Sequence, residues 1–469
     1  PDPEWTRLGR GAFGIKGCPQ GYEENLGKCK TMESVLSSGS DFLLPGLSYD
    51  LAGDQASYVV SRRQTQITCN VPEAGPNSVR QVTFKVADPS GFLDLSSLCF
   101  QWTVVNSDAN NAMTPLSAVP HCCWSRMIIS ISSAVAEDVQ YLSRTEEMLN
   151  RFLPYEKRRN AAAMGFGLAS SSENGADHLP RAVAAGGGEQ RVVWRPLTSG
   201  LLNCGKLFLG MLLGAGGMSI TLEIPQASEI ARNHATDSQT FSFKDLVCHL
   251  DSLQLEESIS SQYANMLLSG RSIMIPYQTW DNTLQHVTVQ TGSQTCNIAR
   301  NFTRLASVFA SLAQEEGTVT ADLAGIQGKL QNNFYLAPQT TANGDVESFI
   351  TLNNKRMPDF NTIGCQMHMK RLLACVGTYS SVAHGSNIND EAYGCVKASA
   401  AKSFIAAFDL EKAAHHGASS TGENLSTGGI LSVNFQKVGS AAASPSRAYI
   451  SCLYDAVCEL KDTGAFVYS

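Results

Sequence analysis

Short runs of alternating apolar and polar residues, separated by turn residues, are the feature that most limits how this 469-residue chain can fold. The runs begin near residue 58 and recur to about residue 460; 66–71 and 82–86 are two clear cases. Alternation gives a strand one buried and one exposed face, and Asn, Asp, Gly and Pro between the runs form turns. An α/β fold would need a helix of roughly 10–15 residues between most strands, and those helices are missing. The pattern predicts an all-β fold.

The strand-like runs fall into two groups of similar size. Each group has about eight strand candidates, one helical stretch and one long loop. The helical stretches are expected at 137–153 and 364–376, and the long breaks at 161–190 and 314–345. Residues 226–240 are polar and resemble a linker. We therefore predict an N-terminal arm and two successive β-sandwiches, over 1–57, 58–232 and 233–469.

Composition excludes several classes of protein. Hydrophobic residues make up 43% of the chain, which is enough for a large core and argues against disorder. The formal net charge is −7, whereas a dedicated nucleic-acid binder needs a basic surface. No apolar run approaches the ~20 residues that span a bilayer. Only 16% of residues are charged, which suits a chain that buries surface against other copies of itself.

The 14 cysteines include no C-x-x-C pair. Several lie in apolar strand-like runs, where a thiol behaves as a small hydrophobic group. We expect mostly reduced thiols and synthesis inside a cell. Cys18 and Cys29 bracket a glycine-rich segment of the arm and are the best candidates for a disulfide.

Five segments resemble chemical motifs, and each lacks the context that its chemistry requires. The glycines of 9–14 match a dinucleotide loop, but no strand precedes them. Segment 200–207 ends in Leu where a phosphate-binding loop needs Ser or Thr. Segment 399–402 matches S-x-x-K without its companion motifs. The remaining residues do not have the spacing that is typical of a metal site; they are Cys365, His368, Cys375, His415 and His416. The sequence predicts no catalytic residue, cofactor or metal.

Several stretches, taken in order, carry a resemblance to a known family. They are 92–100, 115–131, the helix 137–153, 247–255 with the short helix 261–268, 404–412, 431–435 and 449–460. This order resembles the double jelly-roll major capsid proteins of double-stranded DNA viruses, in particular the polinton-like, virophage-like and adintovirus-like lineage. The likeness covers about 58–460 and rests on element order, since no single motif is diagnostic. The stretch 247–255 resembles the opening of the second jelly roll.

The resemblance implies two consecutive eight-stranded jelly rolls with short helical excursions and an N-terminal arm. It further implies that three copies form a pseudo-hexameric capsomer, and that capsomers tile an icosahedral shell around the genome. The implied partners are other copies of the chain, penton proteins and minor capsid proteins, with the arm contacting an internal membrane or a cement protein. The implied location is the virion, assembled inside the host cell, and strong direct nucleic-acid binding is not expected.

Three alternatives remain open at this point. Jelly rolls also occur in carbohydrate- or receptor-binding proteins, which would need clustered aromatic residues; the five tryptophans are instead dispersed. A β-sandwich enzyme with paired carboxylates, such as a glycosidase, has no motif in its favour. A cellular protein derived from a captured capsid gene would have the same sequence pattern.

Overall fold

The computed structural model describes residues 59–468 except 88–90, 133, 170–179, 211–216, 233–235, 288–291, 315–333, 341–343, 380–385, 387, 389–392, 396–400, 413–421, 426–428, 440–444 and 462–463. The arm expected over 1–57, and with it the proposed Cys18–Cys29 disulfide, lies outside the described residues.

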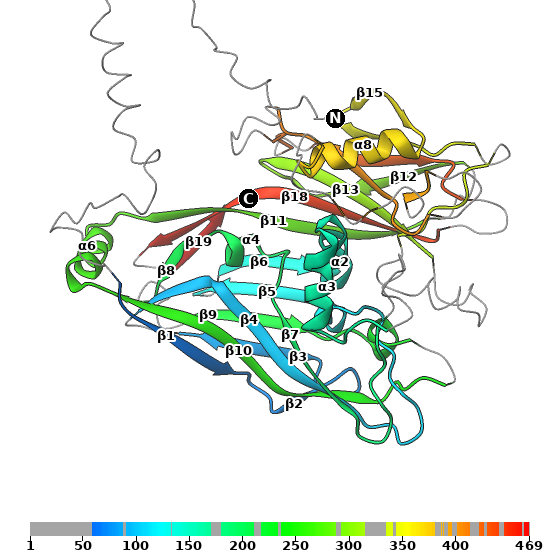
Figure 1. Ribbon diagram of the computed structural model, residues 1–469. Helices are drawn as coiled ribbons and strands as arrows, with labels where there is room; N and C mark the ends of the chain where they lie inside the picture. Colours follow the sequence, from blue (N-terminus) through cyan, green and yellow to red (C-terminus); the bar gives the residue numbers. More distant parts are fainter. Residues whose placement is uncertain are drawn as a thin grey trace, which may run out of the picture. The chain divides into compact units, whose positions relative to one another are not determined.

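The first sandwich is built from two antiparallel sheets (Figure 1). One sheet, here called the β1 sheet, has the strand order β1 (Val59–Thr68), β10 (Phe241–Leu255), β4 (Phe92–Asn106), β7 (Glu189–Trp194). Two short strands extend it, β2 (Glu73–Ala74) and β8 (Leu207–Leu209). The other sheet has the order β3 (Gln81–Val86), β9 (Met218–Glu223), β5 (Arg126–Ile131), β6 (Ala134–Gln140).

The second sandwich repeats this arrangement. Its β11 sheet has the order β11 (Ile273–His286), β18 (Arg447–Lys461), β13 (Leu305–Ala313), β16 (Ile405–Asp409), and β19 (Gly464–Tyr468) pairs with β18. Its other sheet has the order β12 (Ser293–Ile298), β17 (Leu431–Gln436), β14 (Glu347–Leu352), β15 (Lys355–Ile363).

Strand order identifies the topology. Three strands, β2, β8 and β19, lie outside the four-strand paths of the sheets. When the other strands are counted along the chain, each sandwich has its first, eighth, third and sixth strands in one sheet. The second, seventh, fourth and fifth strands form the other sheet, in that order. Two four-stranded sheets connected in this way form a jelly roll. The expectation of two eight-stranded jelly rolls in succession is confirmed.

The alternation seen in the sequence sets the two faces of the strands. In β5 and β9 every second residue is buried between the two sheets. The third and eighth strands lie in the middle of their sheets and are buried over most of their length, as in β4 and β18. Aromatic rings fill the first core: Trp102 lies 5.1 Å from Trp124, and Trp124 lies 5.8 Å from Phe243, measured between ring centroids.

Helices occur only in the connections of the described chain. They are η4 (Pro120–Cys123), α2 (Leu142–Phe152), α3 (Tyr155–Ala163), α4 (Gly200–Asn203), α5 (Ala227–Ile230), α6 (Glu257–Leu268) and α8 (Cys365–Cys375). In each sandwich a helix follows the fifth strand, α2 after β6 and α8 after β15. The helix α6 joins the last strand of the first sandwich to the first strand of the second.

Three sequence expectations need correction. The boundary at 233 is too early, because β10, which was expected to open the second jelly roll, pairs with β1 and β4 of the first. Strand pairing therefore places the change of sandwich at α6. The helix expected at 137–153 begins only at Leu142, because 137–140 belong to β6 and Tyr141, with a φ of 49°, separates strand from helix. The break at 161–190 includes the end of α3 and the start of β7.

Candidate functional site: the junction between the two sandwiches

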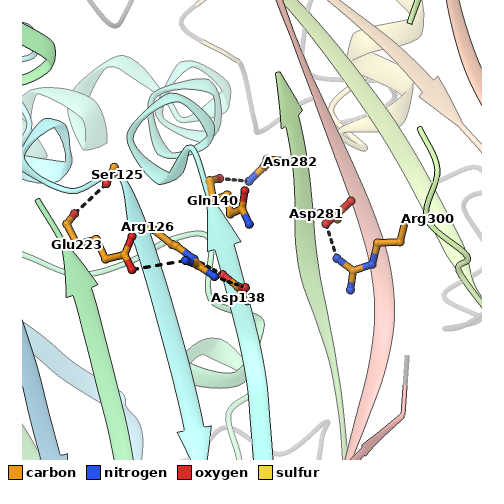
Figure 2. A network of polar contacts seen from close by, with 8 residues as sticks. All are labelled: Ser125, Arg126, Asp138, Gln140, Glu223, Asp281, Asn282 and Arg300. Carbon is orange, nitrogen blue, oxygen red and sulfur yellow. Dashed lines mark hydrogen bonds and ion pairs between the residues drawn. The ribbon is translucent and has the colours of Figure 1, made fainter. Parts of the chain in front are cut away.

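The two sandwiches meet along two edge strands, β6 of the first and β11 of the second. Tyr277 Oη on β11 donates a 2.6 Å hydrogen bond to the carbonyl oxygen of Ala136 on β6. Asn282 Nδ2 on β11 donates to the carbonyl oxygen of Gln140 at 2.7 Å, as Figure 2 shows. Unpaired strand edges are sites of unwanted association. Here each edge is covered by the other sandwich.

The helix α2 adds a second contact to the junction. Its Arg144 is buried, and Nη2 donates to the carbonyl oxygen of Leu312 on β13 at 3.3 Å. The guanidinium carbon lies 4.1 Å from the ring centroid of Phe334 and 5.3 Å from that of Tyr449, both in the second sandwich. Burial lowers the pKa of Arg144 to about 10, so the side chain stays charged at neutral pH. Cation–π contacts of this kind strengthen when they are shielded from water.

A third contact comes from the short helix α4. Gly200, its first residue, lies so close to β11 that a Cβ atom there would overlap the carbonyl oxygen of Gln278. The buried carboxylate of Glu137 lies beneath this helix and accepts hydrogen bonds from Ser199 Oγ and from the backbone nitrogen of Leu201. Burial raises the pKa of Glu137 to about 7, although these hydrogen bonds favour the ionised form.

A buried ion cluster anchors α2 to α3 and η4 within the first sandwich. Glu147 accepts from Arg158 Nη2 at 2.7 Å, and His121 Nε2 lies 3.1 Å from its other oxygen. Burial alone would raise the pKa of Glu147, but Arg158, His121 and Arg151 together hold this pKa well below its ordinary value. A buried charge is tolerated only when it is paired in this way. The cluster orients α2 toward the second sandwich.

Partly exposed charged side chains lie on β5, β6 and β9 of the first sandwich and on β11 of the second. Arg126 forms two hydrogen bonds with Asp138, of 2.7 and 2.8 Å, and lies 3.5 Å from Glu223 (Figure 2). On β11, Asp281 pairs with Arg300. A polar cleft of about 530 Å³ opens between the sandwiches, and both Arg126 and Arg144 line it. The Arg126 contacts join β5 to its two neighbours, β6 and β9.

The segments that resembled chemical motifs have structural roles where they are described. Segment 200–207 forms α4, a turn and the start of β8, without the long helix of a phosphate-binding loop. Segment 9–14, Ser399 and the pair His415–His416 lie outside the described residues.

Cys365, His368 and Cys375 share the helix α8. The Nδ1 of His368 is 2.7 Å from the carbonyl oxygen of Gly364, and a carbonyl oxygen only accepts, so Nδ1 carries the proton. Nε2 therefore accepts from Ser348 Oγ at 2.7 Å. Burial lowers the pKa of His368 to about 4, which leaves the ring neutral. Across the described chain, no cluster of three or more His, Cys, Asp or Glu side chains is arranged to hold a metal ion.

Two further features of the described residues bear on function. Trp102, Trp124, Trp194 and Trp280, the four tryptophans that the structure describes, are all buried. They cannot form the exposed aromatic platform that the carbohydrate-binding alternative requires. In the part of the chain that is described, no helix is both long and apolar enough to cross a membrane.

Comparison with known proteins adds the decisive observation. No protein-family model matches the sequence, and none of the curated proteins matches it. Solved structures do match: VP54 of the virus PBCV-1, fitted into a reconstruction of the virophage Sputnik, superposes with a TM-score of 0.60 at 11% identity. The match covers 88% of this chain and 98% of VP54.

The chain is a double jelly roll. The Faustovirus major capsid protein superposes on it with a TM-score of 0.56 at 7% identity, covering 93% of this chain and 97% of that protein. A chain of the Sputnik virophage structure gives 0.50 at 13% identity, with 91% and 92% covered. The double jelly roll thus extends over nearly the whole of both partners in each comparison.

The junction residues of this double jelly roll were not found by sequence reasoning. Tyr277 and Gly200 were not singled out for their contacts, because the partner strand lies far away in the sequence. In α2 the charged side chains of Arg144, Glu146 and Glu147 are buried, whereas charged residues of an amphipathic helix ordinarily face water.

Proposed function

We propose that this chain is a structural, non-enzymatic major capsid protein of a double-stranded DNA virus. Three copies form a pseudo-hexameric capsomer, and capsomers tile an icosahedral shell. The observation that carries the proposal is the double jelly roll itself, whose two sandwiches have the same strand order and which matches VP54 and the Faustovirus major capsid protein over almost their full lengths. Three such chains supply six similar sandwiches, the number that a hexagonal tile needs.

The junction supports this role. Each subunit of a shell bears mechanical force from the neighbouring capsomers, so its two sandwiches must be held rigidly together. The edge-strand contact, the buried Arg144 and the close approach of Gly200 to β11 provide such a connection. The low fraction of charged residues, 16%, suits extensive contacts between copies.

The proposal includes partners and location. Other copies of the chain are the main partner, and penton and minor capsid proteins complete the shell. The arm over 1–57 contacts an internal membrane or a cement protein, and the virion is assembled inside the host cell. With a net charge of −7, the chain does not bind the genome strongly by itself.

Light scattering after size-exclusion chromatography tests the proposal, with negative-stain images of the same fractions. A trimer of about 151 kDa, three times 50.4 kDa, with hexagonal particles or closed shells is the expected result. A monomer that does not assemble at any salt concentration or pH would contradict it and favour a binding module or an enzyme. Genome-containing shells from the native source would distinguish a viral protein from a cellular one derived from a captured capsid gene.

A further inference from the structure

Two cysteines come close together in the second sandwich, although they are 30 residues apart in the sequence. Cys365 is the first residue of α8 and is 3% exposed. Cys395 lies in the connection between α8 and β16 and is partly exposed. Both carry thiols in the structure. One thiol of this pair is therefore open to solvent and the other is shielded from it.

The two segments touch at Gly394, the residue before Cys395. A Cβ atom at Gly394 would lie 3.4 Å from Cys365 Sγ, so this sulfur is next to the backbone that leads into Cys395. Gln366, the second residue of α8, donates from Nε2 to the carbonyl oxygen of Cys395 at 3.5 Å. Because consecutive Cα atoms are only about 3.8 Å apart, the two cysteines are close neighbours.

The segment that carries Cys395 is anchored in the core of the second sandwich. Tyr393 is completely buried, and its Oη donates a 2.6 Å hydrogen bond to the carbonyl oxygen of Ile405 on β16. Its ring lies 5.5 Å from that of Phe404, measured between centroids. Two residues beyond this anchor, Cys395 is held beside the start of α8.

We propose that Cys365 and Cys395 form a disulfide when the protein passes from the reducing interior of a cell to an oxidising environment. The bond would fix the start of α8 to the connection that leads into β16. A disulfide joins Cα atoms roughly 4.4–6.8 Å apart. We expect side-chain rotation and a small backbone change to reach this spacing, because Gly394, with a φ of 92°, tolerates such changes. The inference needs only the folded chain and is independent of the proposed capsomer.

The reaction requires an oxidant, which we take to be a small disulfide such as oxidised glutathione. The thiolate of Cys395 attacks one sulfur of this disulfide, its S–S bond breaks, and the released glutathione thiolate takes up a proton. Cys365 then gives its proton to solvent, and its sulfur attacks Cys395 Sγ and displaces the second glutathione, which is protonated in turn. Overall, two protein thiols are oxidised to one disulfide, and one glutathione disulfide is reduced to two thiols.

The second step should be the slower one. Burial, with smaller contributions from Cys395 and Asp345, raises the pKa of Cys365 to about 12. Only a thiolate attacks a disulfide, and the thiolate fraction of such a group rises about tenfold per pH unit. We therefore expect glutathione to appear on Cys395 first, and ring closure to accelerate between about pH 7 and pH 9.

Mass spectrometry of the folded chain tests the inference. The protein is incubated with oxidised glutathione, its remaining thiols are blocked with iodoacetamide, and it is digested with trypsin without reduction. The expected product is peptide 357–370 linked to peptide 372–397. The second peptide also contains Cys375, at the other end of α8. Cys375→Ser is therefore the matched control, and it should give the same link.

Two further variants check the order of the steps. Cys365→Ser should keep glutathione on Cys395, because the thiol that displaces it is gone. Cys395→Ser should carry neither the link nor glutathione at Cys365, which is buried. Circular dichroism of the reduced proteins checks folding, and a serine variant that is not folded is replaced by the corresponding alanine variant.

The oxidised wild type should also melt at a higher temperature than the reduced protein, whereas Cys395→Ser should show no such difference. Three results would each overturn the inference: a link from Cys395 to another cysteine, glutathione that persists on Cys395 of the wild type at about pH 9, or an unmodified Cys395. Light scattering in a reducing buffer judges the proposed capsomer separately, because a trimer there supports the capsomer whether or not the disulfide forms.

Discussion

At the residue scale, we expect Glu137 to make the junction sensitive to pH. Its carboxylate is completely buried beneath α4, and burial raises its pKa from 4.5 to about 7. Ser199 Oγ and the backbone nitrogen of Leu201 donate to it and limit that rise. A group with a raised pKa in the folded state favours folding while it is protonated and opposes folding once it must ionise in the core.

The direction of the pH dependence follows from this shift. Below about pH 4.5 the carboxyl group is protonated in both the folded and the unfolded chain, and folding carries no charge penalty. Between about pH 4.5 and 7 the unfolded chain ionises first, so the free energy of unfolding falls as pH rises, by about 3 kcal/mol in total. The variant Glu137→Gln should lack this component, as measured by the difference between its urea-unfolding curves and those of the wild type across this range.

An exposed glutamate provides the matched control. Glu156 lies on α3 and is exposed, so Glu156→Gln should follow the wild type at every pH. If the curves for Glu137→Gln and the wild type stayed parallel from acid to neutral pH, Glu137 would not titrate in this window and its proposed coupling to the junction would be wrong.

At the element scale, α4 shows why a sequence motif and its structural role can differ. Segment 200–207 resembles a phosphate-binding loop because of its glycines. The structure requires glycine at position 200 for another reason, the close approach of β11. Nothing in the neighbouring sequence signals that approach, because Gln278 is far along the chain and belongs to the other sandwich.

Gly200→Ala should therefore weaken the junction strongly. The added methyl group would overlap a backbone carbonyl, which cannot rotate away, so α4 and β11 must separate. We expect a loss of about 3 kcal/mol or more in the free energy of unfolding. Gly205→Ala is the control: Gly205 has a φ of 66° and no atom within 4 Å of an added Cβ, so only backbone strain of about 1 kcal/mol is expected. Equal losses in the two variants, measured by urea unfolding, would refute the close-packing argument.

The boundary between β6 and α2 shows a second limit of prediction from local sequence at the element scale. Val139, Leu142, Met148 and Phe152 have near-helical spacing, which predicted a helix starting at residue 137. Val139 belongs to the strand β6, because β6 completes its sheet by pairing with β5. Strand pairing depends on a neighbour that local periodicity does not reveal.

At the scale of the whole molecule, local pattern predicted the number of strands but not every partner. The alternation in β10 predicted a strand at 247–255, and its position after a polar linker suggested that it opened the second sandwich. The structure places it between β1 and β4, which begin about 180 and 150 residues earlier. The eighth strand of a jelly roll closes the sheet that the first strand began, so its sandwich is decided by long-range pairing. The junction could not be predicted for the same reason.

The junction also predicts how the whole molecule responds to a cut. A site-specific protease sequence inserted at Ser269–Gly270, both exposed at the end of α6, would divide the chain between its two sandwiches. We expect the two halves to elute together in size-exclusion chromatography, because Tyr277, Arg144 and Gly200 still join them. Introducing Gly200→Ala into the cut protein should release them as separate species, whereas Gly205→Ala should not. Halves that separate on cleavage alone would mean that α6, and not the buried junction, holds the double jelly roll together.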